Sequence, residues 1–381
     1  MSKAVRIRKV ENQADFRAFF EFPWTLYKND PNWTPPLLSM RRELLDRKKN
    51  PAWEYLEGEH FTAWRGDQLV GTITAHLNHR HNEFHEERVG WFGTFEVYDD
   101  QEAASALLDT AAAWVKAKGY PILRGPQSFT THEEVGILVD GFSRPVLLMA
   151  YNPPYYARLL EGAGFQKAMD VYSFYIDRAR GGSPGYFEKL ERVTRRLMER
   201  QRLSVRPIDR KNLKREFALF KELYNVAWEK NWGFVPMTAR ELDAMVKSLG
   251  QFFDPNLAFF AYVGDEPVGF VMAVPDFNQV LQRAYPRPGE PEIFTLLKAL
   301  YYWKIRPVID WARVPLMGVK EGYRNRGIES VLMYYILQAL LRGRFNHCDC
   351  GWILETNNLV SISKTIGLEI YKTHRFYEKT V

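Results

Sequence analysis

Two segments of the chain repeat the same hairpin pattern. Each consists of an apolar strand, a Gly-Asp turn and a second apolar strand, and the turns begin at Gly66 and Gly264. A Gly-Asp turn between two apolar runs favours a β-hairpin. One such hairpin constrains little, but both are followed by matching strands and helices. The sequence therefore predicts that one domain pattern is used twice.

The matching elements continue after both hairpins. A strand that ends at Val97 leads into a helical run, and a strand that ends at Val319 does the same. Alternating strands and helices of this kind predict a mixed α/β sheet. We predict an N-terminal unit, a linker helix and a C-terminal unit, at residues 1–180, 181–202 and 203–381.

Composition limits the classes of function. The net charge is +6 over 381 residues, which is too small to demand a nucleic-acid partner. No apolar run is long enough to span a bilayer. Residues 1–6 lack the apolar stretch of a signal peptide. We therefore expect a cytoplasmic protein that has no transmembrane segment and binds no nucleic acid, while its oligomeric state stays open.

The segment after Val319 carries the clearest chemical signal. An apolar strand ends there, and a turn rich in Gly and Arg opens the next helix. Such a turn brings free backbone N–H groups and the positive end of a helix to one point. Arg324 and Arg326 add positive charge. These features predict a pyrophosphate cradle, and the alternative is a basic helix cap. The motifs of a Walker loop and of a dinucleotide-binding turn are absent from this segment.

The run Arg324-Asn325-Arg326-Gly327-Ile328 resembles the acyl-CoA pyrophosphate loop of the GNAT acyltransferase superfamily, and Glu329 stands where that pattern has a small residue. Residues 351–357 resemble the family's fifth strand with its Asn, and residues 371–377 resemble its last hairpin. The whole chain is similar to a tandem-domain bacterial subgroup of unknown substrate. The resemblance implies an α/β fold of two tandem GNAT-like domains, each a mixed, mostly antiparallel sheet flanked by helices.

The resemblance also implies a function. It indicates an acyl-CoA-dependent N-acyltransferase, in which an amine attacks the thioester of acetyl-CoA or another acyl-CoA directly and no metal takes part. The acceptor would be an amine-bearing small molecule or a lipid precursor. The residues that the resemblance assigns to CoA are Met317, Gly318, Val319, Arg324, Asn325, Arg326, Gly327, Ile328 and Asn357.

Two residues are candidates for proton transfer. Glu355 lies two positions before Asn357, which places both on one face of a strand and makes Glu355 a candidate base. A structural carboxylate paired with Lys372 or Arg375 is the alternative. Tyr371 is the candidate acid for the thiolate.

The first copy has a different turn at the equivalent place. It carries Asp99, Asp100 and Glu102, which suit a helix N-terminus but would repel a diphosphate. We therefore expect CoA in the second copy alone, with the first copy as scaffold and part of the acceptor pocket. The run His132-Glu133-Glu134 is either a buried cluster that binds an amine or a surface lid of solvated acids.

Two further interpretations concern a metal site and the class of protein. The histidines His76, His79, His81 and His85 have uneven spacing, which favours a solvated loop over a metal site. The alternative to an enzyme is a non-catalytic acyl-CoA-binding sensor or a nucleic-acid-binding module. Thioester turnover would exclude the sensor.

Overall fold

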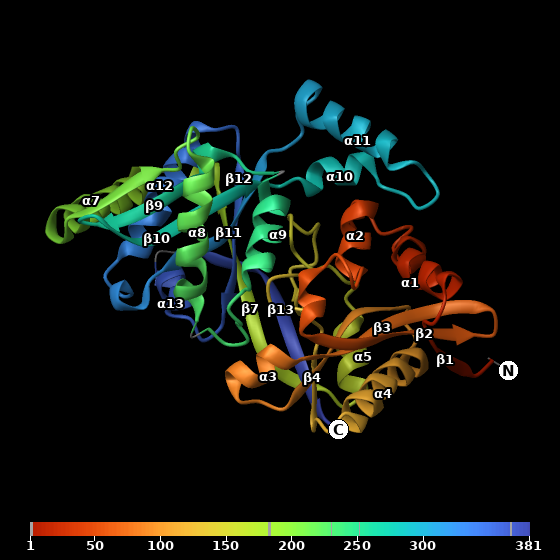
Figure 1. Ribbon diagram of the computed structural model, residues 1–381. Coiled ribbons are helices and arrows are strands. Elements are labelled where there is room, and N and C mark those ends of the chain that lie inside the picture. Colours follow the sequence, from red (N-terminus) through yellow and green to blue (C-terminus); the bar gives the residue numbers. More distant parts are fainter. Residues whose placement is uncertain (1–2, 182–183, 230, 251, 366–367) are drawn as a thin grey trace.

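The computed structural model describes residues 3–181, 184–229, 231–250, 252–365 and 368–381. Its strands form one 13-stranded sheet in the order β1-β2-β3-β4-β5-β13-β7-β12-β11-β10-β9-β8, with β6 paired to β13. Helices flank this sheet, as Figure 1 shows. The β4–β5 and β11–β12 pairs are parallel, and the other named pairs are antiparallel. The predicted fold class, a mixed and mostly antiparallel sheet in two tandem copies, is confirmed.

The first copy comprises the elements up to β7. They are β1 (Val5–Lys9), α1 (Gln13–Leu26), α2 (Leu38–Leu45), η1 (Pro51–Glu54), β2 (Leu56–Arg65), β3 (Gln68–Asn78), α3 (His79–His85), β4 (Val89–Val97), α4 (Gln101–Ala117), β5 (Ile122–Gly125), β6 (Ile137–Asp140), α5 (Tyr156–Gly162) and β7 (Gln166–Asp177).

The linker and the second copy follow. They contain α6 (Arg178–Gly181), α7 (Pro184–Gln201), β8 (Leu203–Pro207), α8 (Leu213–Trp228), α9 (Ala239–Gly250), η2 (Pro255–Leu257), β9 (Ala258–Val263), β10 (Glu266–Pro275), α10 (Asn278–Ala284), α11 (Glu292–Leu300), η3 (Tyr301–Ile305), β11 (Trp311–Val319), η4 (Glu321–Tyr323), α12 (Ile328–Arg342), β12 (His347–Leu354), α13 (Asn358–Thr365) and β13 (Glu369–Thr380). Residues 182–183, at the start of the predicted linker, lie outside the described residues.

Both repeated hairpins are present. The turns at Gly66 and Gly264 join β2 to β3 and β9 to β10, and both glycines have positive φ, 64° and 59°. That backbone conformation costs glycine little and other residues more. The glycine of each Gly-Asp pair therefore meets a conformational requirement of its turn, which is why the pattern predicted both turns.

The two copies exchange their last strands. The C-terminal strand β13 lies between β5 and β7 of the first copy, and β7 in turn pairs with β12 of the second copy. In Figure 1, β7 and β13 stand side by side at the centre of the molecule. The expected hairpin at residues 371–377 is wrong, because β13 runs unbroken from Glu369 to Thr380. Its sequence alternates without a Gly, Pro or Asn at which a turn could form.

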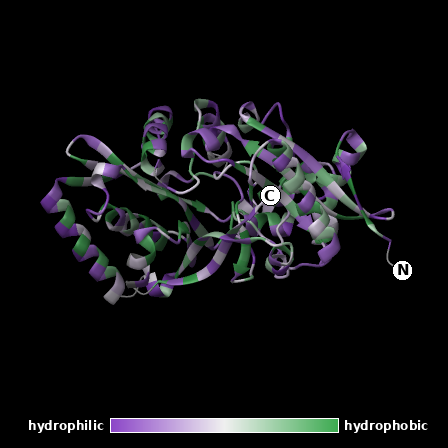
Figure 2. Ribbon diagram, turned by 90° about the horizontal axis from the view of Figure 1, so that it is seen from below, coloured by the Kyte–Doolittle hydropathy of each residue, from purple (hydrophilic) through white to green (hydrophobic). Residues whose placement is uncertain are grey.

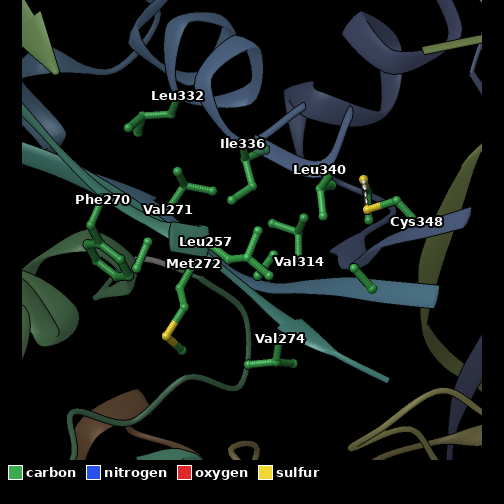
Figure 3. Packing of buried hydrophobic residues seen from close by; sticks show 14 of the residues in the cluster. Leu257, Phe270, Val271, Met272, Val274, Val314, Leu332, Ile336, Leu340 and Cys348 are labelled. Atoms are coloured by element: carbon green, nitrogen blue, oxygen red, sulfur yellow. Dashed lines mark hydrogen bonds between the residues drawn. The ribbon is translucent and has the colours of Figure 1, made fainter. Parts of the chain in front are cut away.

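Helix α12 is fixed on the sheet by a row of apolar residues. Leu332, Ile336 and Leu340 recur every four positions and lie on one face of the helix. They are buried in the core cluster that also holds Val271 and Val314, as Figure 3 shows. The packing positions the start of α12 beside the end of β11. Figure 2 shows hydrophobic residues concentrated along the inner strands and hydrophilic ones spread over the outer helices.

Candidate acyl-CoA and acceptor site

The turn between β11 and α12 has an open helix N-terminus. Gly327 precedes the helix with φ 81° and, as the N-cap residue, has no side chain with which to cap the first turn of α12. A Cβ at Gly327 would lie 2.7 Å from Leu197 Cδ1 on the linker helix α7, so both backbone conformation and space require glycine. Ile328 is fully buried, so only its backbone faces the turn. A helix N-terminus with a glycine at this position can hold an anion at its backbone N–H groups.

The two arginines of the turn have different surroundings. Arg324 donates from Nε to the Val319 carbonyl at 3.2 Å and from Nη2 to the Ala227 carbonyl at 2.6 Å. It therefore ties the turn to β11 and to the end of α8. Arg326 is exposed, and its guanidinium carbon lies 5.2 Å from the centre of the Tyr323 ring. Gln201 of α7 donates to the Arg326 carbonyl at 2.8 Å, so Arg326 is the more available cation.

Glu329 directs its carboxylate toward the same turn. Burial raises the pKa of Glu329, while the backbone N–H groups of Glu329 and Asn325 and the charge of Arg324 act in the opposite direction. The carboxylate thus competes for N–H groups that a diphosphate would use. Like charges at one anion site repel each other.

We predict that Glu329→Ala strengthens CoA binding several-fold, because it removes a negative charge and frees backbone donors. Calorimetric titration with CoA measures the change in dissociation constant. Glu321→Ala, on the same loop, is the control, since it removes an acidic side chain that is exposed and lies before the turn. An affinity that stays unchanged in Glu329→Ala would show that CoA does not use this turn.

The strands β11 and β12 pair over only part of their length. Their parallel ladder extends from Trp311 opposite His347 to Val314 opposite Cys350, and both strands continue beyond it. Met317, Gly318 and Val319 lie on the continuing part of β11, where they pair with β10 on the other side. A Cβ at Gly318 would lie 2.6 Å from the Ala227 Cβ, so glycine allows α8 to approach closely. The arrangement brings the predicted CoA residues of β11 next to the turn at Gly327.

The expected strand position of Glu355 and Asn357 is wrong. Strand β12 ends at Leu354, and both residues lie in the turn that precedes α13. The Asn357 Oδ1 accepts the Leu359 N–H at 2.9 Å, which caps the helix. Glu355 pairs with Lys167 Nζ at 2.6 Å and accepts the Asp170 N–H at 3.1 Å. Glu355 is thus an ion-paired carboxylate, although its partner is Lys167 and neither Lys372 nor Arg375.

Tyr371 belongs to a buried network between β12 and β13. Its hydroxyl donates to Asp349 Oδ2 at 2.6 Å, and Asp349 Oδ1 lies 3.2 Å from Arg313 Nε. Arg313 also donates to the Leu147 carbonyl in the segment that follows β6. Burial, followed by the charge of Asp349, raises the pKa of Tyr371 well above its ordinary value. A raised pKa makes the phenol a weaker proton donor to a thiolate.

The equivalent turn in the first copy is closed by its own side chains. Asp100 Oδ1 accepts the Ala103 N–H at 3.1 Å and caps α4. Arg65 pairs with Asp100 at 2.7 Å and with Glu102 at 2.9 Å, and Asp99 pairs with Arg158. The acids that the sequence singled out thus occupy the helix N-terminus themselves. This supports the expectation that the first copy holds no CoA.

The run His132-Glu133-Glu134 lies between the two copies. His132 contacts the second copy through its Nε2, 3.0 Å from the Val235 carbonyl, and through its Nδ1, 3.0 Å from the Tyr224 hydroxyl. Burial lowers the pKa of His132 and raises that of Glu133, whose Oε1 accepts a hydrogen bond from Asn50 Nδ2 at 3.4 Å. His132 and Glu133 are half-buried and Glu134 is exposed, so neither interpretation from the sequence holds for the whole run, and amine binding stays a prediction.

Glu96 is a titratable group that the sequence reasoning missed. Its Oε2 accepts hydrogen bonds from the Tyr27 hydroxyl at 2.6 Å and the Tyr156 hydroxyl at 3.0 Å. Burial raises the pKa of Glu96 to about 7, against the effects of Tyr27, Arg41 and Tyr156. A carboxylate with a pKa near 7 suits a general base at neutral pH. The signal in the sequence was its place one residue before Val97, where the second copy has Gly318 before Val319.

The expected solvated loop is wrong for two of the four histidines, while His79 is exposed. His76 is fully buried on β3, and His81 is 2% exposed on α3. Burial lowers the pKa of His76 to about 3, so it is neutral. Within the described residues, no group of three His, Cys, Asp or Glu side chains is arranged to hold a metal ion.

The comparisons with known proteins agree with this geometry. Two relatives are each 32% identical to the chain and cover 98% of it: Protein YghO of Escherichia coli strain K12, over 95% of its own length, and the bacterial ceramide synthase of Caulobacter vibrioides, over 96%. A tandem GNAT protein from the clavulanic acid biosynthesis pathway has a TM-score of 0.53 at 11% identity, over 99% of this chain and 98% of its own. The chain belongs to the same family as these two relatives, and its fold is that of a tandem GNAT protein. A GNAT protein from Sphaerobacter thermophilus has a TM-score of 0.51 at 12% identity, over 99% and 95% of the two chains. No protein-family model matches the sequence.

The relative named a ceramide synthase supports acyl transfer as the general reaction. Among the helices of the described residues, none has the length and apolar character that crossing a bilayer requires.

Proposed function

We propose that this tandem GNAT protein transfers an acyl group from acyl-CoA to an amine. The observation that carries the proposal is the difference between the two equivalent turns. The N-cap residue of α12 is Gly327, which has no capping side chain, and its turn lies beside the diverging strands β11 and β12, whereas Asp100 caps α4. The second copy would hold the diphosphate of CoA at residues 324–328, with the pantetheine arm along β11 toward Met317, Gly318 and Val319, and Asn357 near it.

The acceptor in this proposal is an amine carried by a lipid. A relative that is 32% identical over nearly the whole chain is named a bacterial ceramide synthase, and a ceramide is a long-chain amino alcohol acylated on nitrogen. Glu96 of β4, and Glu133 and Glu134 of the loop before β6, are the carboxyl groups that an amine would approach. His132 places their loop against the α8–α9 connection of the second copy. An acceptor held there would lie between the two copies.

The amine must lose a proton before or during attack. Glu355, the candidate from the sequence, has both carboxylate oxygens engaged, one by Lys167 and one by a backbone N–H. Glu96 receives its two tyrosine hydrogen bonds on a single oxygen, Oε2. We therefore favour Glu96 as the group that accepts the proton, directly or through one water. Glu355 is the second candidate, and Tyr371 is the candidate acid for the thiolate.

A thiol-release assay tests the proposed reaction. The purified chain is offered acyl-CoAs of increasing chain length, each with long-chain amino alcohols and with the matching alcohols that lack the amine. We expect CoA release that depends on the amine, with mass spectrometry showing an amide product. Binding of CoA without thiol release for any acceptor would contradict the enzyme and favour an acyl-CoA sensor.

The arginines of the turn give a second prediction. Arg326→Ala should weaken CoA binding about tenfold, because a charge-assisted hydrogen bond to phosphate contributes about 1.5–3 kcal/mol and 1.4 kcal/mol is tenfold. Thermal stability should not change, since Arg326 is exposed. Arg324→Ala should lower both affinity and stability, because it removes two hydrogen bonds to backbone carbonyls.

The binding stoichiometry from calorimetry on both variants should also be one CoA per chain. Two equal sites would contradict a single CoA site in the second copy.

A further inference from the structure

The helix α11 and the turn η3 expose a continuous apolar surface. Only Thr295 and Ala299 of α11 are buried, at 3% and 5% exposure. A surface helix ordinarily turns its apolar stripe toward the protein and its small or polar residues outward. Here the large apolar side chains face solvent: Ile293 56%, Phe294 54%, Leu296 46%, Leu297 57%, Leu300 49%, Tyr301 43% and Ile305 72%. We call these seven residues the apolar platform.

The platform is held firmly at the edge of the molecule. Figure 1 shows α11 beside α10 at the periphery, away from the central sheet. Trp303 packs edge-on against Phe277, with ring centres 5.6 Å apart. The Glu292 carboxylate accepts the Ser39 N–H at 3.0 Å, and Trp24 Nε1 donates to the Pro286 carbonyl at 2.7 Å. The exposed side chains thus project from a segment that is anchored to α1, α2 and α10.

The charges around the platform are positive. Lys298, Lys304 and Arg306 are exposed, and the one acid from residue 292 to 306, Glu292, is bonded to Ser39. Lys304 Nζ lies 3.8 Å from the centre of the Trp303 ring. Apolar side chains bordered by Lys, Arg, Tyr and Trp are the composition of helices that lie in the membrane interface. Lysine is depleted at protein–protein interfaces, which disfavours a second copy as the occupant.

We propose that the apolar platform docks this protein on the surface of an anionic lipid bilayer. The apolar side chains enter the boundary between headgroups and acyl chains, while Lys298, Lys304 and Arg306 face the anionic headgroups. Docking of this kind is peripheral, consistent with helices that do not span a bilayer among the described residues. The inference does not depend on the identity of the acyl donor. A bilayer would supply either a lipid acceptor or a place to release a lipid product.

Vesicle flotation tests the proposal with the full chain. Vesicles of phosphatidylcholine with phosphatidylglycerol are compared with vesicles of phosphatidylcholine alone. We expect binding to the anionic vesicles that weakens with added salt. The double variant Ile293→Ser/Leu297→Ser should bind at least tenfold less, and Lys298→Glu/Lys304→Glu should lose the preference for anionic lipid. Phe84→Ser on α3 is the matched control, because Phe84 is also a large exposed apolar residue, at 38%.

The outcomes separate the possible occupants. Melting temperatures of the variants should match the parent, since the substituted side chains are exposed. Equal binding of the parent and the double serine variant would overturn the proposal, as would no binding of the parent to either vesicle. Light scattering that shows a dimer in the parent and a monomer in the double variant, without vesicle binding, would assign the platform to a second copy instead.

Discussion

Glu96→Gln should lower the rate of acyl transfer by about 10²-fold or more while CoA affinity stays near that of the parent. A positioned general base contributes about 10²–10⁴-fold, and glutamine keeps the shape of the side chain but cannot accept the proton. The CoA turn belongs to the second copy, so loss of a first-copy carboxylate should leave ground-state binding of CoA intact. Single-turnover rates and calorimetric affinities measure the two effects separately.

The dependence on pH follows from the same carboxylate. Glu96 must be ionised to accept a proton, so the parent's rate should rise with pH and level off above its pKa of about 7. Stability should change in the opposite direction. Because the folded state binds the proton more tightly than the unfolded chain, stability falls as pH rises from about 4.5 to about 7. Glu96→Gln should remove both dependences.

Glu355→Gln is the matched control for this prediction. If Glu355 only forms an ion pair with Lys167 and is not the base, turnover of the Glu355→Gln variant should stay within a few-fold of the parent, with a small loss of stability. A loss of about 10²-fold in Glu355→Gln, together with a near-normal rate in Glu96→Gln, would make Glu355 the base. Near-normal rates in both variants would place the proton acceptor elsewhere.

The local sequence pattern predicted the turns, helices and strands of the fold better than it predicted which strands pair with each other. The turns at Gly66 and Gly264 and the capping of α4 by Asp100 follow from residue types at fixed spacing. The exchange of β7 and β13 does not, because an alternating strand sequence predicts a strand and its faces but not its neighbours. The same limit explains the error at Glu355, whose hydrogen-bond partners Lys167 and Asp170 lie on β7, 188 and 185 residues away in the sequence.

The chemistry of the site shows the same limit. The basic turn at residues 324–327 could be recognised because all its groups are contiguous in sequence. The environment of Glu96 could not be recognised from the sequence, since Tyr27, Arg41 and Tyr156 reach this carboxylate from three separate helices or helix ends. The burial of His76 also depends on strands and segments that are distant in sequence, such as the one carrying Phe129. A pKa shift that depends on contacts between residues distant in sequence can be predicted only once the fold is known.

Asp349→Leu should be among the most destabilising substitutions in the chain. Asp349 is fully buried, and Arg313, which is 2% exposed, lies 3.2 Å from it. Removal of one partner of a buried ion pair leaves the other charge uncompensated and costs about 3–5 kcal/mol. The Tyr371 hydroxyl would also lose its acceptor. Denaturant unfolding, read as a lower midpoint with an unchanged slope, measures the loss.

The double variant Arg313→Met/Asp349→Leu distinguishes the cost of an orphaned charge from the cost of altered packing. Replacing both charges by apolar side chains of similar size should destabilise far less than Asp349→Leu alone, because no unpaired charge remains buried. Tyr371→Phe, which keeps the ion pair and removes one hydrogen bond, should cost less than Asp349→Leu. If the double variant is as unstable as the sum of the single variants, the two residues contribute independently and the pair is not the source of the stability. Since β11 and β12 carry this ion pair and β13 carries Tyr371, loss of the pair should also loosen the centre of the exchanged sheet, where the two copies meet.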